Sequence, residues 1–286
     1  MRGLALNGAS SLAESQGDFA RSSDLHREAL ALWRSLGDAG GEARALSGLG
    51  TAATHRGDYA TARGFQERAL ATVPQIGDLP GAARTLDRLG TVARHQGDSK
   101  RAAEHYAESL ELFQSAGDRV NAAIVVSNLG EVCHQSGDRE RVAMLFEEAL
   151  RLQRELDLSD GIAFDLSNLA RVRLELGELE RAAALSWQEV RLFREMGNQL
   201  GLAGALAVCG MVARTRGDPE RAAGFLREGL RLLAELDERS AMPEHLELLA
   251  AAELESGEPL RAARLLGAAT AIRERIASPH RQTTVG

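Results

Sequence analysis

The sequence predicts an all-α protein, an α-solenoid built of seven antiparallel helix pairs. Gly recurs every 20 residues from position 17 to position 137, and Asp follows it each time. The interval returns at Gly177, Gly197, Gly217 and Gly257, and only Asp157 and Asp237 interrupt it. Between these positions, apolar and small residues are spaced by three, four and seven residues, which is the period of an amphipathic helix. A fixed interval over most of 286 residues indicates an internal repeat rather than one globular core.

Each Gly-Asp pair is expected to end one helix and begin the next. Gly tolerates the left-handed backbone that follows a helix end. Asp is a good N-cap because its carboxylate accepts the free amide hydrogens of the next helix. Pro219 and Pro259 come directly after two of these pairs or their equivalents, where proline suits a first helical turn. Each stretch of 20 residues is therefore one helix, and each stretch of 40 residues is one helix pair.

Taken in order, the helix pairs form one solenoid domain, 1–278. The units are expected near residues 1–38, 39–78, 79–118, 119–158, 159–198, 199–238 and 239–278, and a disordered tail is expected at 279–286. Their first helices carry apolar stripes at Leu6, Ala9 and Ala13; Leu46, Leu49, Gly50 and Ala53; Leu86, Leu89, Gly90 and Ala93; Val126, Leu129, Gly130 and Cys133; Leu166, Leu169 and Ala170; Leu206, Cys209, Gly210 and Ala213; and Leu246, Leu249 and Ala250. Small residues on these stripes let antiparallel helices approach closely.

Composition excludes several classes of function. The net charge of -7 argues against broad electrostatic attraction to nucleic acid or to anionic membranes. No apolar run approaches the length of a membrane span, and the N-terminus lacks a signal-peptide core. Cys133 and Cys209 form no metal-type spacing, so free, mostly buried thiols in a reducing cytoplasm are expected. Lys100 is the only lysine, and no Gly-Lys pair for a phosphate-binding loop is present.

The repeat resembles a known family. The order Leu, Leu-Gly, Ala, Gly-Asp-Tyr, Ala, Ala and Pro over residues 43–74 is similar to the tetratricopeptide repeat, and weaker versions cover about residues 3–276. The resemblance implies a right-handed superhelix. The unit here has 40 residues, longer than the family's usual unit, and this long form resembles the repeats of kinesin light chains and of bacterial signalling proteins.

The last unit carries a second resemblance. The run Arg261-Ala262-Ala263-Arg264-Leu265-Leu266-Gly267-Ala268-Ala269 looks like the C-terminal helical sensor region of LuxR-type and other ATPase-linked bacterial transcriptional regulators. Such a resemblance implies a nucleotide-binding switch domain, covalently linked or separate, as a partner. The sequence itself shows neither an ATPase nor a DNA-reading helix pair, so the likeness covers the sensor alone.

The polar face of the first helices is the expected ligand groove. It is predicted to carry Arg44, Arg84, Arg94, Asn128, Asn168, Arg171 and Arg214. Arginine binds carboxylates through a two-pronged contact, so an acidic peptide or an anionic small ligand fits this face. A solvated helix face with no ligand is the plain alternative. The lysine-based carboxylate clamp of chaperone-binding repeats is absent.

No metal, cofactor or catalytic site is expected. His55 and His95 occupy equivalent positions in adjacent units, and His134 lies near the next one. Adjacent repeats place such residues about 10 Å apart, whereas zinc ligands converge to within about 2 Å of one point. No nucleophile has a repeating base partner. Trp33 and Trp187 are interpreted as packing residues.

The function predicted is therefore a non-catalytic protein–protein interaction scaffold. It would be the sensor or assembly module of a bacterial signalling or transcriptional regulator, binding a peptide or a partner protein in its groove. The alternative is a receptor that encloses a small effector molecule within the superhelix, in one pocket with converging polar groups. Direct binding of nucleic acid or membrane is not expected.

The C-terminal helix is expected to be a docking end. Its apolar stripe is wide, and no further amphipathic helix follows Ser278 to cover the far side. An exposed apolar patch usually marks an interface. Leu265, Ile272 and Ile276 are therefore predicted to contact another domain, a partner or a second copy of the chain. A tolerated Ala-rich surface, or a natural chain that continues, is the alternative.

Overall fold

The structure consists of helices joined by short turns. This computed structural model describes residues 2–134 and 137–277, and these contain fourteen α-helices and no strand. No helix runs across Gly57, Gly97 or Gly137. The predicted all-α class is confirmed, while the tail expected at 279–286 lies outside the described residues.

The chain divides into two compact units, Met1–Leu152 and Gln153–Gly286, hereafter unit 1 and unit 2. Unit 1 contains α1 (Arg2–Ser15), α2 (Phe19–Leu36), α3 (Ala39–His55), α4 (Tyr59–Ile76), α5 (Leu79–His95), α6 (Ser99–Ser115), α7 (Arg119–Cys133) and most of α8 (Arg139–Glu155). Unit 2 contains α9 (Ser159–Glu175), α10 (Leu179–Met196), α11 (Gln199–Thr215), α12 (Pro219–Glu235), α13 (Met242–Glu255) and α14 (Pro259–Ala277). The division into seven repeat units stays a prediction of the sequence.

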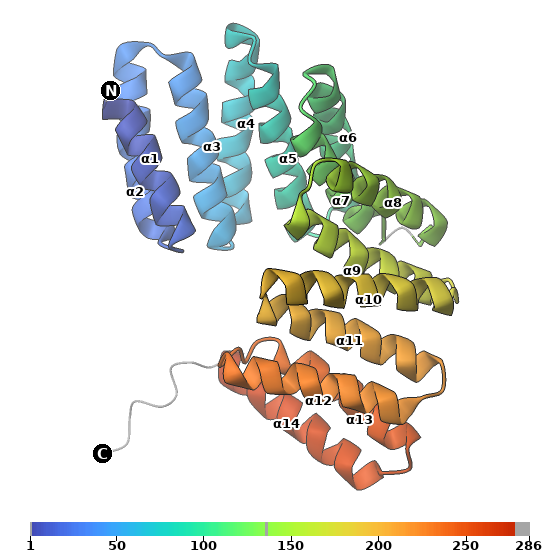
Figure 1. Cartoon of the computed structure of the whole chain (residues 1–286). Helices are drawn as coiled ribbons and strands as arrows, with labels where there is room; N and C mark the ends of the chain where they lie inside the picture. Colours follow the sequence, from blue (N-terminus) through green and yellow to red (C-terminus); the bar gives the residue numbers. More distant parts are fainter. Residues whose placement is uncertain (1, 135–136, 278–286) are drawn as a thin grey trace, which may run out of the picture. The chain divides into compact units, whose positions relative to one another are not determined.

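Within each unit, successive helices pack side by side in opposite directions (Figure 1). In unit 1 this packing runs from α1 to α7, and in unit 2 it runs from α9 to α14. The odd-numbered helices also contact one another, α1 with α3 and α3 with α5, and likewise α9 with α11 and α11 with α13. Helices α1, α3 and α5 therefore form a row in unit 1, and α9, α11 and α13 form one in unit 2.

The turns form as their residue types predict. Gly57 and Gly97 adopt φ values of 76° and 78°, and the other glycines of the 20-residue interval are also left-handed. At the two interruptions, Asp157 and Asp237 take the same backbone conformation, with φ values of 54° and 52°. Asp is among the few residues besides Gly that adopt this region without a large penalty. The turn therefore keeps the same geometry at the two positions where Asp replaces Gly.

A second repeated feature explains the Leu-Gly positions. A methyl group on Gly90 would lie 2.6 Å from the Tyr106 ring, and one on Gly130 would lie 3.0 Å from the Phe146 ring. Both rings are fully buried. Each glycine in a first helix thus lets a bulky side chain, 16 residues later in the second helix, reach the backbone. Close packing of this kind, rather than one central core, holds each helix pair together.

None of the described helices combines the length and the apolar character needed to span a membrane.

Candidate functional site

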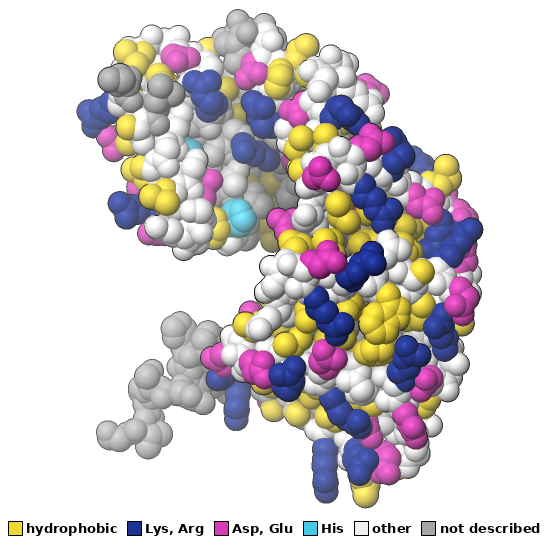
Figure 2. Space-filling view, viewed as in Figure 1, with side chains coloured by type: hydrophobic (Ala, Val, Ile, Leu, Met, Phe, Trp, Pro, Cys, Tyr) yellow, Lys and Arg dark blue, Asp and Glu magenta, His cyan; other side chains and the backbone are white. Residues whose placement is uncertain are grey.

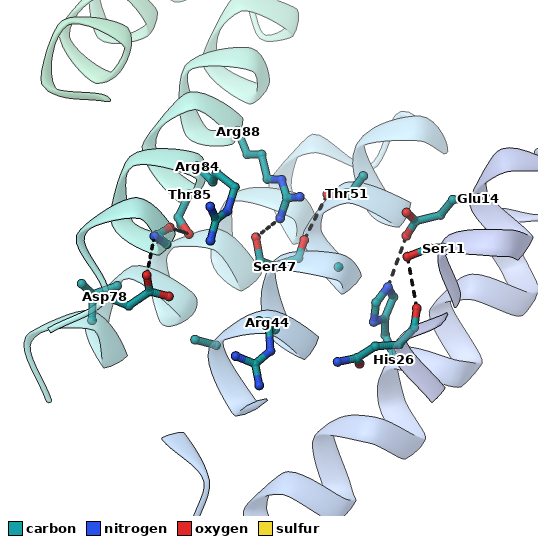
Figure 3. Close-up of a pocket in the computed structure, with 15 residues that line it drawn as sticks. Ser11, Glu14, His26, Arg44, Ser47, Thr51, Asp78, Arg84, Thr85 and Arg88 are labelled. Atoms are coloured by element: carbon teal, nitrogen blue, oxygen red, sulfur yellow. Dashed lines mark hydrogen bonds and ion pairs between the residues drawn. The ribbon is translucent and has the colours of Figure 1, made fainter. Parts of the chain in front are cut away.

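A cavity of about 260 Å³ in unit 1 is lined by residues of α1, α2, α3, α4 and α5 (Figure 3). We call it the unit 1 cavity. Its polar lining comes from Asn7, Ser11 and Glu14 of α1, His26 of α2, Arg44, Ser47 and Thr51 of α3, and Asp78, Arg84, Thr85 and Arg88 at the start of α5 and along it. The contacts of α1 with α3 and of α3 with α5 bring these side chains together.

Two arginines of the cavity have no acidic partner. Arg44 and Arg84 are exactly one 40-residue repeat apart, so neighbouring first helices present them at equivalent positions. Both side chains are exposed at the cavity. Among the described residues, no Asp or Glu lies within ion-pairing distance of either guanidinium. These two predicted groove residues are therefore free to bind an anion.

A third arginine, Arg88, is held by uncharged groups. Its guanidinium donates to the hydroxyl of Ser47. That hydroxyl donates in turn to Gln66 Oε1 over 2.9 Å, and Gln66 Nε2 returns a bond to the Ser47 carbonyl over 3.0 Å. Burial lowers the pKa of the Arg88 guanidinium, and the charge of Asp87 partly restores it. A mostly buried cation without an ion pair favours any anion that reaches it.

The opposite side of the cavity carries a histidine and a carboxylate (Figure 3). His26 Nε2 lies 3.2 Å from Glu14 Oε1, which also accepts a bond of 2.8 Å from Ser22 Oγ. The His26 ring lies directly over Gly48, where a methyl group would overlap it. Burial lowers the pKa of His26 more than Glu14 raises it, so the imidazole is neutral at pH 7. Glu14 is thus already engaged by hydrogen-bond donors.

The charge of the cavity is positive although the chain is acidic. Three guanidinium groups face two carboxylates, those of Glu14 and Asp78. The Asp78 carboxylate accepts the Gly81 amide hydrogen over 2.8 Å as the cap of α5, so it is also engaged. The chemistry available here is recognition of an anion by charge-assisted hydrogen bonds. The Ser47 hydroxyl, which lines the cavity, bonds to Gln66 and Arg88 rather than to a base.

The other predicted groove residues have protein partners. In unit 1, Arg94 pairs with Glu131 over 2.7 Å, and Asn128 Nδ2 donates to Asp87 Oδ1 over 3.0 Å. Each of these contacts joins α5 to α7. A ligand that uses Arg94 or Asn128 must therefore compete with an existing contact.

The predicted groove residues of unit 2 are also engaged. Arg171 pairs with Glu244 over 3.1 Å, and Arg214 lies 3.7 Å from Glu255. Asn168 donates over 3.0 Å to the carbonyl of Phe164 in its own helix. The structure thus groups only Arg44 and Arg84 of the predicted set around one cavity.

The histidines considered for a metal have other contacts. His55 stacks on Phe19 with ring centroids 4.2 Å apart, and His95 stacks on Tyr59 at 5.1 Å. These two contacts are equivalent, one repeat apart. Within residues 2–134 and 137–277, no group of three His, Cys, Asp or Glu side chains is placed to hold a metal ion. Neither cysteine is part of a disulfide; Cys209 is buried, whereas Cys133 is only half-buried.

Unit 2 contains a second, smaller cavity of about 220 Å³, lined by residues of α10, α11 and α12 and of the turn between α11 and α12. Trp187 is 42% exposed there and meets the Phe225 ring edge-on, with centroids 5.6 Å apart. Arg221 lies over the same Phe225 ring at 5.7 Å. Figure 2 shows hydrophobic surface over this unit with basic side chains around it. Trp33 is buried as expected, but Trp187 is more exposed than a packing residue would be.

A buried carboxyl group lies on the same helix as Trp187. Glu189 of α10 is 3% exposed, and its Oε2 atom has no hydrogen-bond partner among the described residues. Burial raises its pKa to about 7, against a hydrogen bond from Ser167 and the charge of Arg171, which lower it. Its protonation is therefore sensitive to pH near neutrality.

Sequence reasoning missed Arg88, His26 and Glu14. Arg88 follows Arg84 by four residues, a spacing that places both on one helix face, so it was detectable. His26 belongs to a second helix, and its approach to the cavity depends on Gly48, which leaves room for the ring. That contact joins different helix pairs, so the sequence repeat does not predict it.

The residues of the predicted docking end lie along α14. Leu265 is partly buried and packs against a core cluster that includes Leu249 and Leu226. Ile272 is half-buried, whereas Ile276 is 47% exposed. Leu266, one position after Leu265, is 48% exposed. Exposed and half-buried apolar side chains thus alternate along the helix.

Comparisons with known proteins agree with this architecture. The sequence matches no curated protein. The fold is similar to that of a signal transduction ATPase with numerous domains from Pyrococcus horikoshii, which has a tetratricopeptide repeat sensor: the TM-score is 0.79 at 19% identity, covering 97% of this chain and 43% of that one. It is also similar to the apo form of the quorum sensor NprR from B. thuringiensis, with a TM-score of 0.76 at 17% identity, covering 95% of this chain and 76% of that one.

A third similar structure is a Rap conjugation gene regulator of the plasmid pLS20, solved in complex with the Phr* peptide. The TM-score is 0.68 at 15% identity, and the match covers 97% of this chain and 75% of that one. At such identities these likenesses show the fold alone. The family model described as Tetratricopeptide repeat matches residues 2–75 and 81–155, which is more than half of the chain. The chain therefore belongs to the tetratricopeptide repeat family.

Proposed function

We propose that this chain is a non-catalytic interaction module that binds an acidic peptide or an acidic segment of a partner protein. The unit 1 cavity with its free arginines Arg44 and Arg84 is the observation that carries this proposal. In a chain of net charge -7, two exposed guanidinium groups at one cavity without acidic partners are a specific feature. Many surface arginines elsewhere pair with nearby carboxylates, as Arg27 does with Asp24 in unit 1 and Arg231 with Glu235 in unit 2. Others, such as Arg56 and Arg264, have no such pair among the described residues, so the distinctive feature is that Arg44 and Arg84 line one cavity.

The module would serve as the sensor or assembly part of a bacterial signalling or transcriptional regulator. Two of the similar structures are named as a quorum sensor and as a regulator bound to a peptide, and a third is an ATPase with a sensor of this repeat type. An ATPase or DNA-binding domain, covalently linked or separate, is the partner this proposal implies. Binding at the cavity would then be reported through the row of first helices. The setting we propose is the cytoplasm.

In this proposal, the remaining groove residues contribute after rearrangement. Arg94 and Asn128 in unit 1, and Asn168, Arg171 and Arg214 in unit 2, would exchange a protein partner for ligand. Their present partners, such as Glu131 for Arg94, are carboxylates or carbonyls. An acidic peptide would offer the same chemistry.

Peptide binding by charge gives a direct test. Extended peptides rich in Asp and Glu should bind, and matched peptides with Asn and Gln at the same places should not, when measured by fluorescence anisotropy. Added salt should weaken the binding because the charges are partly exposed. The double variant Arg44→Ala, Arg84→Ala should lose most of it, whereas Arg63→Ala with Arg101→Ala, two arginines that do not line the cavity, should not. If the folded Arg44→Ala, Arg84→Ala protein binds the acidic peptide as tightly as the unaltered protein does, the proposed site is wrong.

A receptor for a small effector is the second candidate function. A single cavity of about 260 Å³ with converging polar groups favours it, since small ligands bind in concave sites with a few well-placed polar groups. The two candidates differ in the length dependence of affinity. A peptide site gains affinity with each added residue, whereas an effector site gains none beyond the group that fills the cavity.

We also propose that α14 is a docking end, through Leu265, Ile272 and Ile276 together with Leu266. Because Leu265 packs against the core, the exposed positions are the cleaner test. Light scattering should show less self-association for Leu266→Glu with Ile276→Glu than for the unaltered protein. Two equally stable monomers with equal binding of a hydrophobic dye would reject self-association at this end.

A further inference from the structure

We propose that the unit 1 cavity selects a single carboxylate group, bound jointly by Arg44, Arg84 and Arg88, and that it discriminates against phosphate. This inference rests on the proposed function and names the chemical group that enters the cavity. It adds Arg88 to the site and excludes dianions, which a simple basic surface would prefer.

The charge balance of the lining favours a monoanion. Arg44, Arg84 and Arg88 face Glu14 and Asp78, so the lining residues carry one net positive charge when His26 is neutral. Asp87, outside the lining, also acts on Arg88 and can only reduce this positive charge. One carboxylate cancels this charge. A phosphate monoester carries close to two negative charges at pH 7. Its second charge would face Glu14 and Asp78 without a free cation to compensate it, and like charges at short range in a half-enclosed site repel strongly.

The hydrogen-bonding groups of the arginines suit a planar ligand with two acceptor atoms. A guanidinium presents parallel N–H groups that match both oxygens of a carboxylate. Arg44 and Arg84 approach from adjacent helices, and Arg88 lies one turn beyond Arg84 on α5 (Figure 3). The Ser47 hydroxyl, which accepts from Arg88 and donates to Gln66, fixes the direction of the Arg88 side chain. An anion therefore meets one cation that is held by a hydrogen bond, Arg88, and two exposed cations without an acidic partner among the described residues.

No acceptor within the described chain takes the place of this anion. Thr85 Oγ1 donates to the Gly81 carbonyl over 2.8 Å, and Thr51 Oγ1 donates to the Ser47 carbonyl over 3.1 Å. Asp78 is used by the cap of α5 and Glu14 by His26 and Ser22. The carboxylates of the cavity are thus occupied by other donors, which leaves Arg44 and Arg84 for a ligand.

Small carboxylates test this inference without knowledge of the natural ligand. Four probes are titrated by ligand-observed NMR and competition at pH 7.5: N-acetyl-diglycine, its C-terminal amide, N-acetyl-glutamic acid amide, and inorganic phosphate. At least one of the two carboxylate probes should bind, and which of them does so identifies a terminal or a side-chain carboxylate as the source. The amide should bind at least about tenfold more weakly, because a charge-assisted hydrogen bond is lost. Phosphate should bind more weakly than the preferred carboxylate.

Variants then assign the effect to the three arginines. Arg84→Gln and Arg88→Gln should each weaken the affinity for the carboxylate probe by about tenfold or more. Arg84→Lys keeps the charge but lacks the two parallel N–H donors of a guanidinium, so its loss of affinity should be intermediate. Arg63→Gln on α4, outside the cavity lining, is the matched control and should leave affinity unchanged. Circular dichroism and thermal unfolding establish that each variant is folded. If Arg88→Gln is unstable, Arg44→Gln replaces it as the second test.

Three outcomes would overturn the inference: equal binding of acid and amide, tighter binding of phosphate than of either carboxylate, or unchanged affinity in the folded arginine variants. The long acidic peptides described above separate this failure from that of the proposed function. If those peptides bind and the small carboxylates do not, the module binds acidic partners by another surface. If neither class binds, both proposals fail.

Discussion

Replacing Glu189 by Gln should stabilise unit 2 at alkaline pH and leave it nearly unchanged at acidic pH. The Glu189 carboxyl is 3% exposed, and burial raises its pKa from 4.5 to about 7. Ser167 and Arg171 oppose this rise, and the Cys209 thiol on the neighbouring helix α11 is close enough to be affected by the Glu189 charge. The folded protein therefore holds a proton that the unfolded chain releases at lower pH.

The direction and size of the effect follow from this difference. Between pH 4.5 and about 7 the folded state binds more protons than the unfolded state, so the free energy of unfolding falls as pH rises through that window. The rise is about 2.5 pKa units, and each unit corresponds to about 1.4 kcal/mol. Ionised Glu189 therefore costs about 3 kcal/mol of stability above pH 7, a cost that is absent below pH 4.5. A neutral Gln of the same shape avoids it at every pH.

The measurement is urea unfolding at pH 5 and pH 8, followed by fluorescence in a Trp33→Phe background. Trp187, on the same helix as Glu189, is then the sole tryptophan and reports on unit 2. Glu195→Gln, also on α10, is the matched control: its carboxylate is exposed and lies 3.9 Å from Arg191, so removing it should change stability by less than about 1 kcal/mol. A Glu189→Gln variant whose stability relative to the parent is the same at both pH values would refute the reasoning.

Two further predictions concern packing. Gly90→Ala should destabilise unit 1 by about 1–3 kcal/mol, because its methyl group would lie 2.6 Å from the Tyr106 ring. The Gly97 position faces open space but has a φ of 78°, so Gly97→Ala should lower the free energy of unfolding by only about 1 kcal/mol, through backbone strain. Thermal unfolding of both variants checks the order, and a larger loss for Gly97→Ala would contradict it. Thiol labelling at pH 8 should modify Cys133 much faster than Cys209, since Cys209 is buried and burial raises its pKa to about 11. Mass spectrometry after a short pulse gives the two rates, and equal rates would show that α11 opens freely.

Local chemistry made the helices predictable. Each turn depends on residues within three positions of one another: Asp58 accepts the Thr61 amide hydrogen over 3.2 Å, and Gly57 supplies the left-handed backbone. Such contacts need no information from the rest of the chain, so composition and spacing suffice. The stripe of small residues was readable for the same reason, although the bulky partners, such as Tyr106 over Gly90, became evident only in the structure.

The lining of the candidate site was only partly predictable. The 40-residue period marked Arg44 and Arg84 as equivalent, and the structure places both at one cavity. The same argument marked Arg94 equally well, yet the structure pairs it with Glu131, 37 residues away on another helix. Whether an arginine is free or paired depends on which acid the next first helix presents, and the period does not contain that information.

The sequence by itself determined the repeat, the helix ends and the class of side chain on each helix face, because these depend on neighbours along the chain. Only the tertiary structure decided which of those side chains meet. Arg88 reaches the Ser47 hydroxyl 41 residues earlier, and His26 enters the cavity over Gly48. Contacts between helix pairs depend on the register and spacing of the packed helices, to which many weak interactions contribute together. The anion site that we propose in unit 1 arises at that level, where two arginines of neighbouring repeats line one cavity without an acidic partner among the described residues.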